Sequence, residues 1–521
     1  MRIETLRYLL AALLALCTAL AAPLAHADPA DITATSRSVV RVVLIADAEG
    51  EPSLVGHGSG FAVAPDIILT NAHVVEAAQQ QDDIRIGVVP SQGKGGWFGR
   101  VIAFAPKSDL ALVKLVERGS LPPVSMFTGP VDDGSAVVAV GYPGNVDVAQ
   151  GLNVGDIVSP TSPVKTQGSV SAGRSSKSFE TILHTAPIGA GNSGGPLLDP
   201  CGRVIGVNSF GTVSSDGDSE FYFAVSGQEV LRFLRASGIT PRVTGIACRG
   251  LADLDREEAE RLAGEKIDSD EAARTAAAQQ HDNAEKAERT ALFNVIAERE
   301  NGLALAALAL LLALASGGGA FVLYDRARAR EAKFAGIAAG LLMIGAGAAW
   351  LLRPGFGQVD ERAKALASAA SAVKAVPGAT GKHGSGEFIC TIDLPRSRVT
   401  VSDTADVQLA WGKDGCANGK QQYAPGTDGW SLVSGPDADD AVTVSSFDPA
   451  SASYRSRRYF LDLDTLAKFR EGQKKLGAPA CGSGEAGASR AAEAQAALTA
   501  LLPSTPNERL VYDCREVKRA D

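Results

Sequence analysis

The heptapeptide GNSGGPL, residues 191–197, places Ser193 between glycines on both sides. A serine hydroxyl is a weak nucleophile until a base removes its proton. The negative oxygen that forms when the serine attacks a carbonyl needs backbone N–H groups pointing into a cavity, and glycines allow the loop to supply them. We therefore interpret this stretch as a nucleophile loop, with the N–H groups of Gly191 and Ser193 as its oxyanion hole.

Two stretches upstream carry the other groups that such a serine needs. TNAHVV, residues 70–75, contains His73, and SDLALV, residues 108–113, contains Asp109. An imidazole is a useful base for serine when a third group fixes its tautomer. The order His, Asp, Ser predicts a catalytic triad of His73, Asp109 and Ser193. His57 and His184 have no such motif around them, and we interpret both as structural or surface histidines.

The region around these motifs has the pattern of an all-β domain. Between residues 38 and 225, short Val- and Ile-rich runs alternate with Gly, Pro, Asn and Asp, which predicts a barrel or a sandwich. The candidate strands are residues 39–45, 60–63, 67–70, 111–115, 136–140 and 204–208. One helix closes the domain, where Ser226 and Glu229 suit a capping box and Gly238 supplies a stop.

With these motifs, about residues 36–240 resemble the trypsin-like serine proteases, and within that clan they are most similar to the bacterial HtrA (Deg) family. Further matches are VGYPG at 140–144, GSVSA at 168–172, VIGVN at 204–208 and FAV at 223–225. The resemblance implies a chymotrypsin-like double β-barrel, mainly β, with His73 and Asp109 from the first barrel and Ser193 from the second. It implies a serine endopeptidase, a hydrolase of peptide bonds that requires no cofactor and no metal.

The same resemblance bears on substrate specificity. Enzymes of this clan that cut after basic residues carry an acid six positions before the serine, where this chain has Pro187. Pro187 and Ile188 predict a pocket of small apolar groups, which favours small aliphatic side chains before the scissile bond. Asn208 stands near the position of a pocket histidine in glutamate-specific relatives, so cleavage after glutamate is not expected.

Charge excludes one class of partner. The net charge of −9 argues against nucleic acid, which needs a basic protein surface. Residues 251–300 hold 14 acidic and 7 basic residues, a net of −7, so the acidity belongs mainly to this stretch. HtrA proteases carry PDZ domains after the catalytic domain, and none is recognisable here. Residues 241–300 instead have the composition of charged helices.

Three apolar segments predict export and membrane insertion. Residues 1–27 resemble a secretory signal peptide, with an uncleaved anchor as the alternative. Residues 302–324 and 334–352 are long enough to cross a bilayer; a buried hairpin of a soluble protein is the alternative. The basic connector 325–333 belongs in the cytoplasm by the positive-inside rule, which puts both flanking portions outside. We expect a bacterial inner-membrane protein whose protease and C-terminal domains face the periplasm or the extracytoplasmic side.

Six cysteines follow the signal segment, and an oxidising compartment permits disulfides between them. Cys201 and Cys248 form a candidate pair in the protease portion. Four more lie in the C-terminal portion, where three pairings are possible. They are Cys390, Cys416, Cys481 and Cys514.

The predicted domain map has six parts. They are a signal peptide (1–27), a protease domain (28–240), a charged helical linker (241–300), a transmembrane hairpin (301–353), a low-complexity linker (354–385) and a C-terminal domain (386–521). The C-terminal domain is expected to be a small α+β fold with an unknown partner. Its candidate strands are 398–401 and 442–446, and its candidate helix is 491–502. The aromatic and basic cluster 454–460 suits a strand with buried aromatic residues better than a partner-binding surface.

The sequence thus predicts a membrane-anchored serine endopeptidase outside the cytoplasm, cleaving unfolded or regulatory envelope proteins. The alternative is a membrane sensor or scaffold that uses a latent protease fold to bind protein segments.

Overall fold

The computed structural model describes residues 29–517, except 49–50, 176–178, 213–219, 373–384, 403, 427–428, 438–439, 478–480 and 482–483. The predicted signal peptide lies outside these residues. The chain divides into two compact units. The first comprises Met1–Glu257 and Lys382–Asp521, and the second comprises Glu258–Gly381. Each unit is described by itself below.

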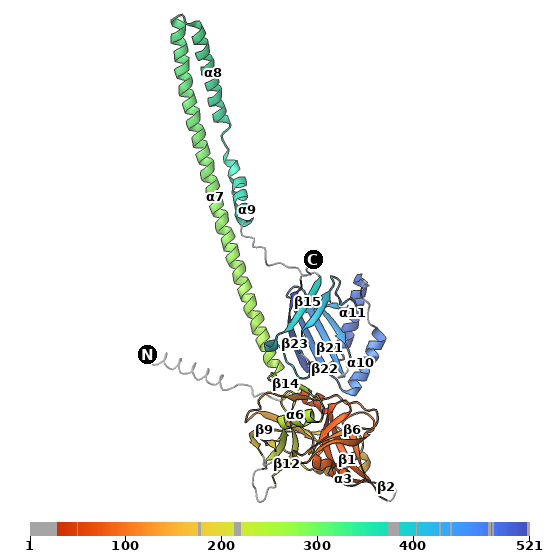
Figure 1. Ribbon diagram of the computed structural model, residues 1–521. Helices are drawn as coiled ribbons and strands as arrows, with labels where there is room; N and C mark the ends of the chain where they lie inside the picture. The colour runs from red at the N-terminus through yellow and green to blue at the C-terminus, as the bar shows by residue number, and fades with distance from the viewer. Residues whose placement is uncertain are drawn as a thin grey trace, which may run out of the picture. The chain divides into compact units, whose positions relative to one another are not determined.

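Six strands close into the first barrel, in the order β1-β2-β3-β6-β5-β4 (Figure 1). Their bounds are β1 Val39–Ala48, β2 Glu51–Ala64, β3 Ile67–Thr70, β4 Ile84–Pro90, β5 Trp97–Ala105 and β6 Leu110–Leu115. Valine and isoleucine fill the interior because β-branched side chains pack well on a pleated surface. The four strands expected here are confirmed, and helix α3 (Ala72–Gln80) follows β3 directly.

Six more strands form the second barrel, which closes because β11 pairs with both β8 and β12. The bounds are β8 Ala136–Gly141, β9 Val164–Ser175, β10 Glu180–His184, β11 Pro196–Leu198, β12 Val204–Gly211 and β13 Tyr222–Ser226. Two short strands, β7 (Ser125–Phe127) and β14 (Arg242–Thr244), extend its sheet beyond β12. Two short helices, α4 (Gly144–Ala149) and α5 (Val154–Ile157), lie between β8 and β9.

The expected closing helix is α6 (Gly227–Ala236). The Ser226 side chain accepts a hydrogen bond from the Glu229 N–H, and Gly238 has a φ of 75°. A residue with positive φ is a common helix stop, so Gly238 acts as expected. Of the expected capping box, the structure shows the serine half, while the Glu229 carboxylate accepts a hydrogen bond from Arg232 at 2.6 Å.

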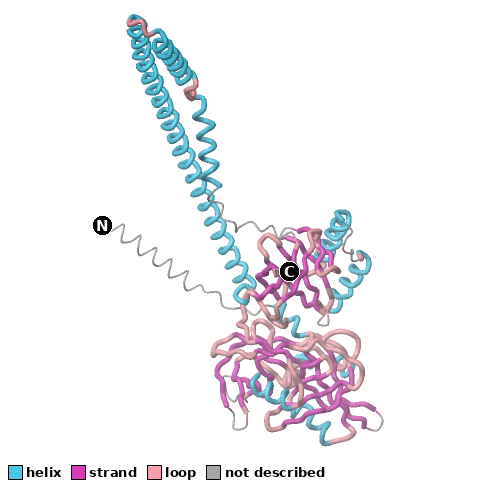
Figure 2. Tube along the Cα trace, turned by 45° about the horizontal axis from the view of Figure 1, so that its top comes forward, coloured by secondary structure: helices cyan, strands magenta, loops and turns pink. Residues whose placement is uncertain are grey.

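The described part of the second unit contains helices joined by short loops and no strand (Figure 2). It contains most of α7 (Leu251–Asp325) and all of α8 (Ala329–Leu351), and both include windows apolar enough to cross a membrane. α7 is continuous, so no break separates the charged segment from the apolar one. Alanine, glutamate and arginine favour helix, and no proline interrupts the run. Within the expected low-complexity linker, a single 3-10 turn, η1 (Phe356–Gln358), leads into α9 (Val359–Ala372), an alanine-rich helix.

The C-terminal domain is α+β, with a nine-stranded sheet in the order β18-β17-β16-β15-β23-β22-β21-β20-β19. The strands are β15 Gly386–Ile392, β16 Val407–Trp411, β17 Cys416–Ala417, β18 Gln421–Gln422, β19 Ala424–Gly426, β20 Gly429–Ser434, β21 Ala441–Asp448, β22 Ser453–Phe460 and β23 Glu508–Glu516. Helices α10 (Leu463–Leu476) and α11 (Gly484–Thr499) pack beside the sheet (Figure 1). A 3-10 turn, η2 (Leu394–Arg396), follows β15.

Two expectations for this domain need correction. Residues 398–401 form no strand, only a single bridge from Arg398 to Arg509. The Glu508 carboxylate accepts the N–H groups of Thr400 and Val401, at 2.6 and 2.5 Å, which a neighbouring strand would otherwise accept. The expected helix 491–502 begins earlier and ends at Thr499.

The other expectations for this domain fit the structure. Residues 442–446 lie in β21, and the cluster 454–460 lies in β22 with Tyr459 buried. The disulfides are Cys390–Cys514 and Cys416–Cys481, a pairing that the sequence left open, and Cys201–Cys248 as expected.

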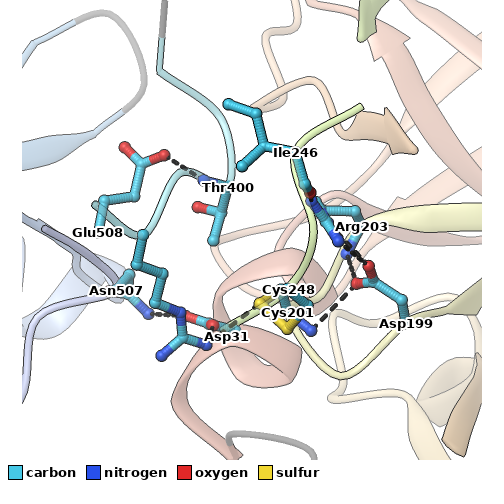
Figure 3. The surroundings of a disulfide bond; sticks show 10 residues. Asp31, Asp199, Cys201, Arg203, Ile246, Cys248, Thr400, Asn507 and Glu508 are labelled. Atoms are coloured by element: carbon cyan, nitrogen blue, oxygen red, sulfur yellow. Dashed lines mark hydrogen bonds and ion pairs between the residues drawn. A yellow bond between two sulfur atoms is a disulfide. The ribbon is translucent and has the colours of Figure 1, made fainter. Parts of the chain in front are cut away.

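Within the first unit, the C-terminal domain contacts α2 (Pro29–Ser36) beside the Cys201–Cys248 disulfide (Figure 3). Asp31 of α2 forms a buried ion pair with Arg398. Its other carboxylate oxygen accepts a hydrogen bond of 2.9 Å from the Asn507 side chain. This contact joins helix and domain through buried polar groups.

Candidate active site

The loops at the ends of strands carry the three residues of the expected triad. His73 lies in the first turn of α3, and Asp109 lies in the turn just before β6, both in the first barrel. Ser193 lies in the loop between β10 and β11 of the second barrel. The elements that bear them therefore match the distribution implied by the protease resemblance.

His73 and Asp109 form a close pair. His73 Nδ1 lies 2.9 Å from Asp109 Oδ1 and 3.0 Å from Oδ2, and the His73 backbone N–H donates to Oδ1 at 3.1 Å. Asp109 has a φ of 52°, which is uncommon for a non-glycine residue, and the Asn71 side chain donates to its carbonyl at 2.7 Å. The carboxylate thus fixes Nδ1 as the protonated nitrogen and leaves Nε2 to act as a base.

Ser209, on β12, is a member of the site that the sequence analysis missed. Its hydroxyl donates to Asp109 Oδ2, and its carbonyl accepts the hydroxyl of Ser193 at 2.8 Å. It therefore contacts both ends of the expected triad. The only sequence signal was its place directly after the VIGVN match.

The loop around Ser193 contains two glycines with a left-handed backbone. Gly191 has a φ of 99° and Gly194 of 86°, values that favour glycine. The Ser59 hydroxyl donates to the Gly191 carbonyl at 2.7 Å, and the Ser59 N–H donates to the Ser193 carbonyl at 2.8 Å. Among the described residues, none accepts a hydrogen bond from the N–H of Gly191 or Ser193. Both donors are thus available to an oxyanion.

The three residues expected to line a substrate pocket lie in different environments. Pro187 is exposed, and Ile188 is half-buried against the core of the second barrel. Asn208 is fully buried, and its side-chain amide donates to the Pro196 carbonyl at 2.9 Å. Asn208 therefore presents no surface to a substrate in this structure, because its amide serves the barrel interior.

The two remaining histidines of this domain are neutral at pH 7. Burial, and next the charge of Arg41, lower the pKa of His57 below its ordinary value. Burial lowers the pKa of His184 to about 4. In the described part of the chain, no group of three or more His, Cys, Asp or Glu side chains is placed to hold a metal ion.

Comparison with known proteins supports this assignment at the level of the domain. Residues 58–207 match the family model of the trypsin-like peptidase domain. The match begins in β2, ahead of His73, and ends in β12, beyond Ser193.

Individual relatives extend the similarity to the HtrA group. "Serine protease Rv3671c" of Mycobacterium tuberculosis is 30% identical over 240 residues, which cover 43% of this chain and 54% of that protein. "Serine protease HTRA1" of Xenopus tropicalis is 33% identical over 184 residues, 34% of this chain and 36% of its own. "Probable periplasmic serine endoprotease DegP-like" of Pseudomonas fulva is 35% identical over 196 residues, 36% of each chain.

The chain thus spans about a third to a half of the length of these curated relatives. The expected resemblance to trypsin-like, HtrA-type serine proteases is confirmed for the protease domain.

Proposed function

We propose that the protein is a serine endopeptidase with Ser193 as nucleophile, anchored in a membrane and acting outside the cytoplasm. The observation that carries the proposal is the link from His73 through Asp109 to Ser209, which in turn holds Ser193 beside an unoccupied pair of backbone donors. The match to the trypsin-like peptidase domain and the names of the relatives support the same reaction.

The reaction follows from these contacts. The Ser193 hydroxyl turns from Ser209 toward His73, whose Nε2 takes its proton as Oγ attacks the substrate carbonyl. The N–H groups of Gly191 and Ser193 stabilise the oxyanion. His73 then gives the proton to the leaving amine. In the second half of the reaction, His73 takes a proton from a water molecule that attacks the acyl-enzyme, and it returns that proton to the Ser193 oxygen as the acid product leaves. Asp109 keeps the imidazole oriented throughout.

The expected preference for small aliphatic side chains rests on the apolar side chains of Pro187, which is exposed, and Ile188, which is half-buried. The substrate class we propose is unfolded or regulatory envelope protein.

The membrane part of the proposal rests on α7 and α8, whose apolar windows are little buried by the described chain. The basic stretch 325–333 between the two apolar segments carries Arg326, Arg328 and Arg330, which favours its place in the cytoplasm. A relative whose name includes "periplasmic" agrees with a protease domain on the other side. We propose a bacterial inner membrane with the protease and C-terminal domains outside.

One observation bears on the alternative of a latent, binding-only protease fold. The Ser193 hydroxyl donates to the Ser209 carbonyl rather than to His73. A catalytic hydrogen bond often forms only in the substrate complex, so this observation fits both functions.

Cleavage of unfolded casein by the full chain in detergent tests the proposal, with Ser193→Ala as the control. We expect the wild type to cleave, and the variant to lose cleavage with an unchanged thermal midpoint. Equal cleavage by Ser193→Ala would refute the assignment of the nucleophile. Casein retained by both proteins without cleavage by the wild type would favour the binding-only function.

A further inference from the structure

A cluster of polar and charged side chains is buried beneath the nucleophile loop, outside the triad. We call it the Arg41 cluster: Arg41 of β1, His57 of β2, Asp147 of α4 and Tyr142, which follows β8. Arg41 Nη2 lies 2.9 Å from Asp147 Oδ1, and the two side chains are only 2% and 8% exposed. The Arg41 guanidinium also lies over the Tyr142 ring, 4.7 Å from its centre.

Within this cluster His57 acts as a hydrogen-bond donor. Its Nε2 lies 3.1 Å from the Tyr142 carbonyl oxygen and 3.4 Å from Asp147 Oδ2. A carbonyl oxygen and a carboxylate oxygen accept hydrogen bonds, so His57 Nε2 is the nitrogen that carries the hydrogen. Burial and Arg41 lower the pKa of His57, which leaves the ring neutral in this tautomer at pH 7.

The cluster touches the oxyanion loop at Gly191. A Cβ added to Gly191 would lie 2.3 Å from the Tyr142 carbonyl oxygen and 2.7 Å from His57 Nε2. These are closer than side-chain carbons approach such atoms, so Gly191 rests directly on the hydrogen bond between His57 and Tyr142. The N–H of Gly144 adds a bond of 2.7 Å to the Ala190 carbonyl, from the same segment.

Ser59, which lies on β2 of the first barrel with His57, connects Tyr142 and Gly191 of the second barrel. Its hydroxyl accepts the Tyr142 N–H at 2.9 Å and donates to the Gly191 carbonyl at 2.7 Å. The backbone of Tyr142 is thus held at its N–H by Ser59 and at its carbonyl by His57. A shift of the Tyr142 carbonyl would move the surface on which Gly191 lies.

We propose that His57 is a positioning residue for peptide-bond cleavage: by holding the Tyr142 carbonyl it sets the place of the Gly191 N–H in the oxyanion hole. The inference rests on the proposed function. His57 touches neither substrate nor reacting atoms; it acts through Tyr142 and Gly191. Because an oxyanion donor stabilises the transition state more than the bound substrate, a misplaced Gly191 lowers kcat and leaves KM unchanged.

A matched pair of variants isolates the hydrogen bond. Glutamine can place an amide N–H where His57 has Nε2, whereas methionine has a similar length and no donor. We expect His57→Met to lower kcat by about tenfold to a hundredfold, less than the roughly 10²- to 10³-fold loss on deleting an oxyanion donor. We expect His57→Gln to stay within about threefold of wild type. KM should stay unchanged in both variants.

The measurement uses the full chain in detergent, a fluorogenic peptide amide with valine before the scissile bond, and thermal midpoints recorded in parallel. A peptide boronate, whose tetrahedral adduct places an oxygen in the oxyanion hole, should lose affinity for His57→Met in step with kcat. If His57→Met does not fold, His57→Asn replaces it, because its amide is one methylene too short to reach Tyr142.

The outcomes separate the two levels of the proposal. An inactive wild type overturns the proposed function and this inference with it. An active wild type with full kcat in the methionine variant overturns the inference alone. So does an equal loss in both variants accompanied by equal losses of thermal midpoint, because that pattern marks a purely structural role.

Discussion

Two of the buried arginine–aspartate pairs in the described chain, Arg41–Asp147 and Asp31–Arg398, differ in what surrounds them. Arg41 lies over the Tyr142 ring and Asp147 lies beside His57, and both Tyr142 and His57 lie against Gly191 of the loop that carries Ser193. Asp31 and Arg398 lie where the C-terminal domain meets α2, beside the Cys201–Cys248 disulfide (Figure 3). We therefore expect the first pair to act on the proposed reaction and the second on the domain contact. Variants near the nucleophile loop should therefore change kcat, and variants at the domain contact should change the thermal midpoint.

The largest effect expected on the reaction side is that of Asp109→Asn. The amide cannot hold His73 in the tautomer that leaves Nε2 free, so kcat should fall by about 10⁴-fold, as in other triads. Thermal unfolding should be little changed, since the side chain is partly exposed. Steady-state kinetics on the valine peptide amide measures this. A loss of less than tenfold would contradict the role of Asp109.

The largest effect expected on the contact side is that of Arg398→Met. It removes the guanidinium that pairs with the buried Asp31 carboxylate, and breaking a buried ion pair costs about 3–5 kcal/mol. The thermal midpoint should fall by about 10 °C, with kcat at 25 °C unchanged.

Arg470→Met is the matched control for that variant. Arg470 pairs with Asp440 in the same domain, at 3.2 Å and with its side chain 53% exposed. Exposed ion pairs contribute little, so its midpoint should stay near wild type. Equal midpoints for Arg398→Met and Arg470→Met would remove the distinction between a buried contact and a surface one.

A smaller effect is expected from pH on the second barrel. Burial lowers the pKa of His184 to about 4, below its value of 6.5 in the unfolded chain. As pH falls, the unfolded chain binds a proton at His184 before the folded chain does. The part of the free energy of unfolding that comes from neutral His184 is therefore present above pH 6.5 and is lost as pH falls toward 4. At pH 4.5 the loss is about 2 kcal/mol.

His184→Leu removes this titration. Thermal midpoints at pH 7 and pH 4.5 should differ less in the variant than in the wild type, because carboxylates still titrate in both. An identical pH dependence in the two proteins would show that His184 is already charged or solvated in the folded state.

The smallest effect is expected for Ser209→Ala. The variant removes the hydroxyl that donates to Asp109 but keeps the carbonyl that accepts from Ser193. A hydrogen bond to a charged group contributes about 1.5–3 kcal/mol, and Asp109 keeps its bonds to His73, so we expect kcat to fall about tenfold. An unchanged kcat would show that the Ser209 hydroxyl has no role in the reaction and only a structural role in the barrel.

Sequence alone predicted those features that lie within one short stretch. The strand 67–70, the helix capped by Ser226 and the three triad motifs each carry their own local signal. Contacts between residues on distant strands were not predicted, because residue type alone does not show which side chains the fold brings together. Ser209 and Ser59 belong to this group, since each contacts residues brought close only by the two barrels.

Burial explains two other departures. Asn208 was expected at a substrate pocket, but its amide is used inside the barrel. The stretch 398–401 has the alternation of a strand, yet the buried Glu508 side chain accepts its N–H groups. The disulfide pairing of the C-terminal domain likewise depends on the sheet, which sets Cys390 opposite Cys514 on neighbouring strands.

Labelling with a fluorophosphonate tests the central claim, an activated Ser193, most directly. The full chain in detergent is treated with the probe in the presence and absence of unfolded casein, with Ser193→Ala alongside. We expect covalent labelling of the wild type that disappears in the variant. Labelling of Ser193→Ala as strong as that of the wild type, or no labelling of the wild type under either condition, would contradict it.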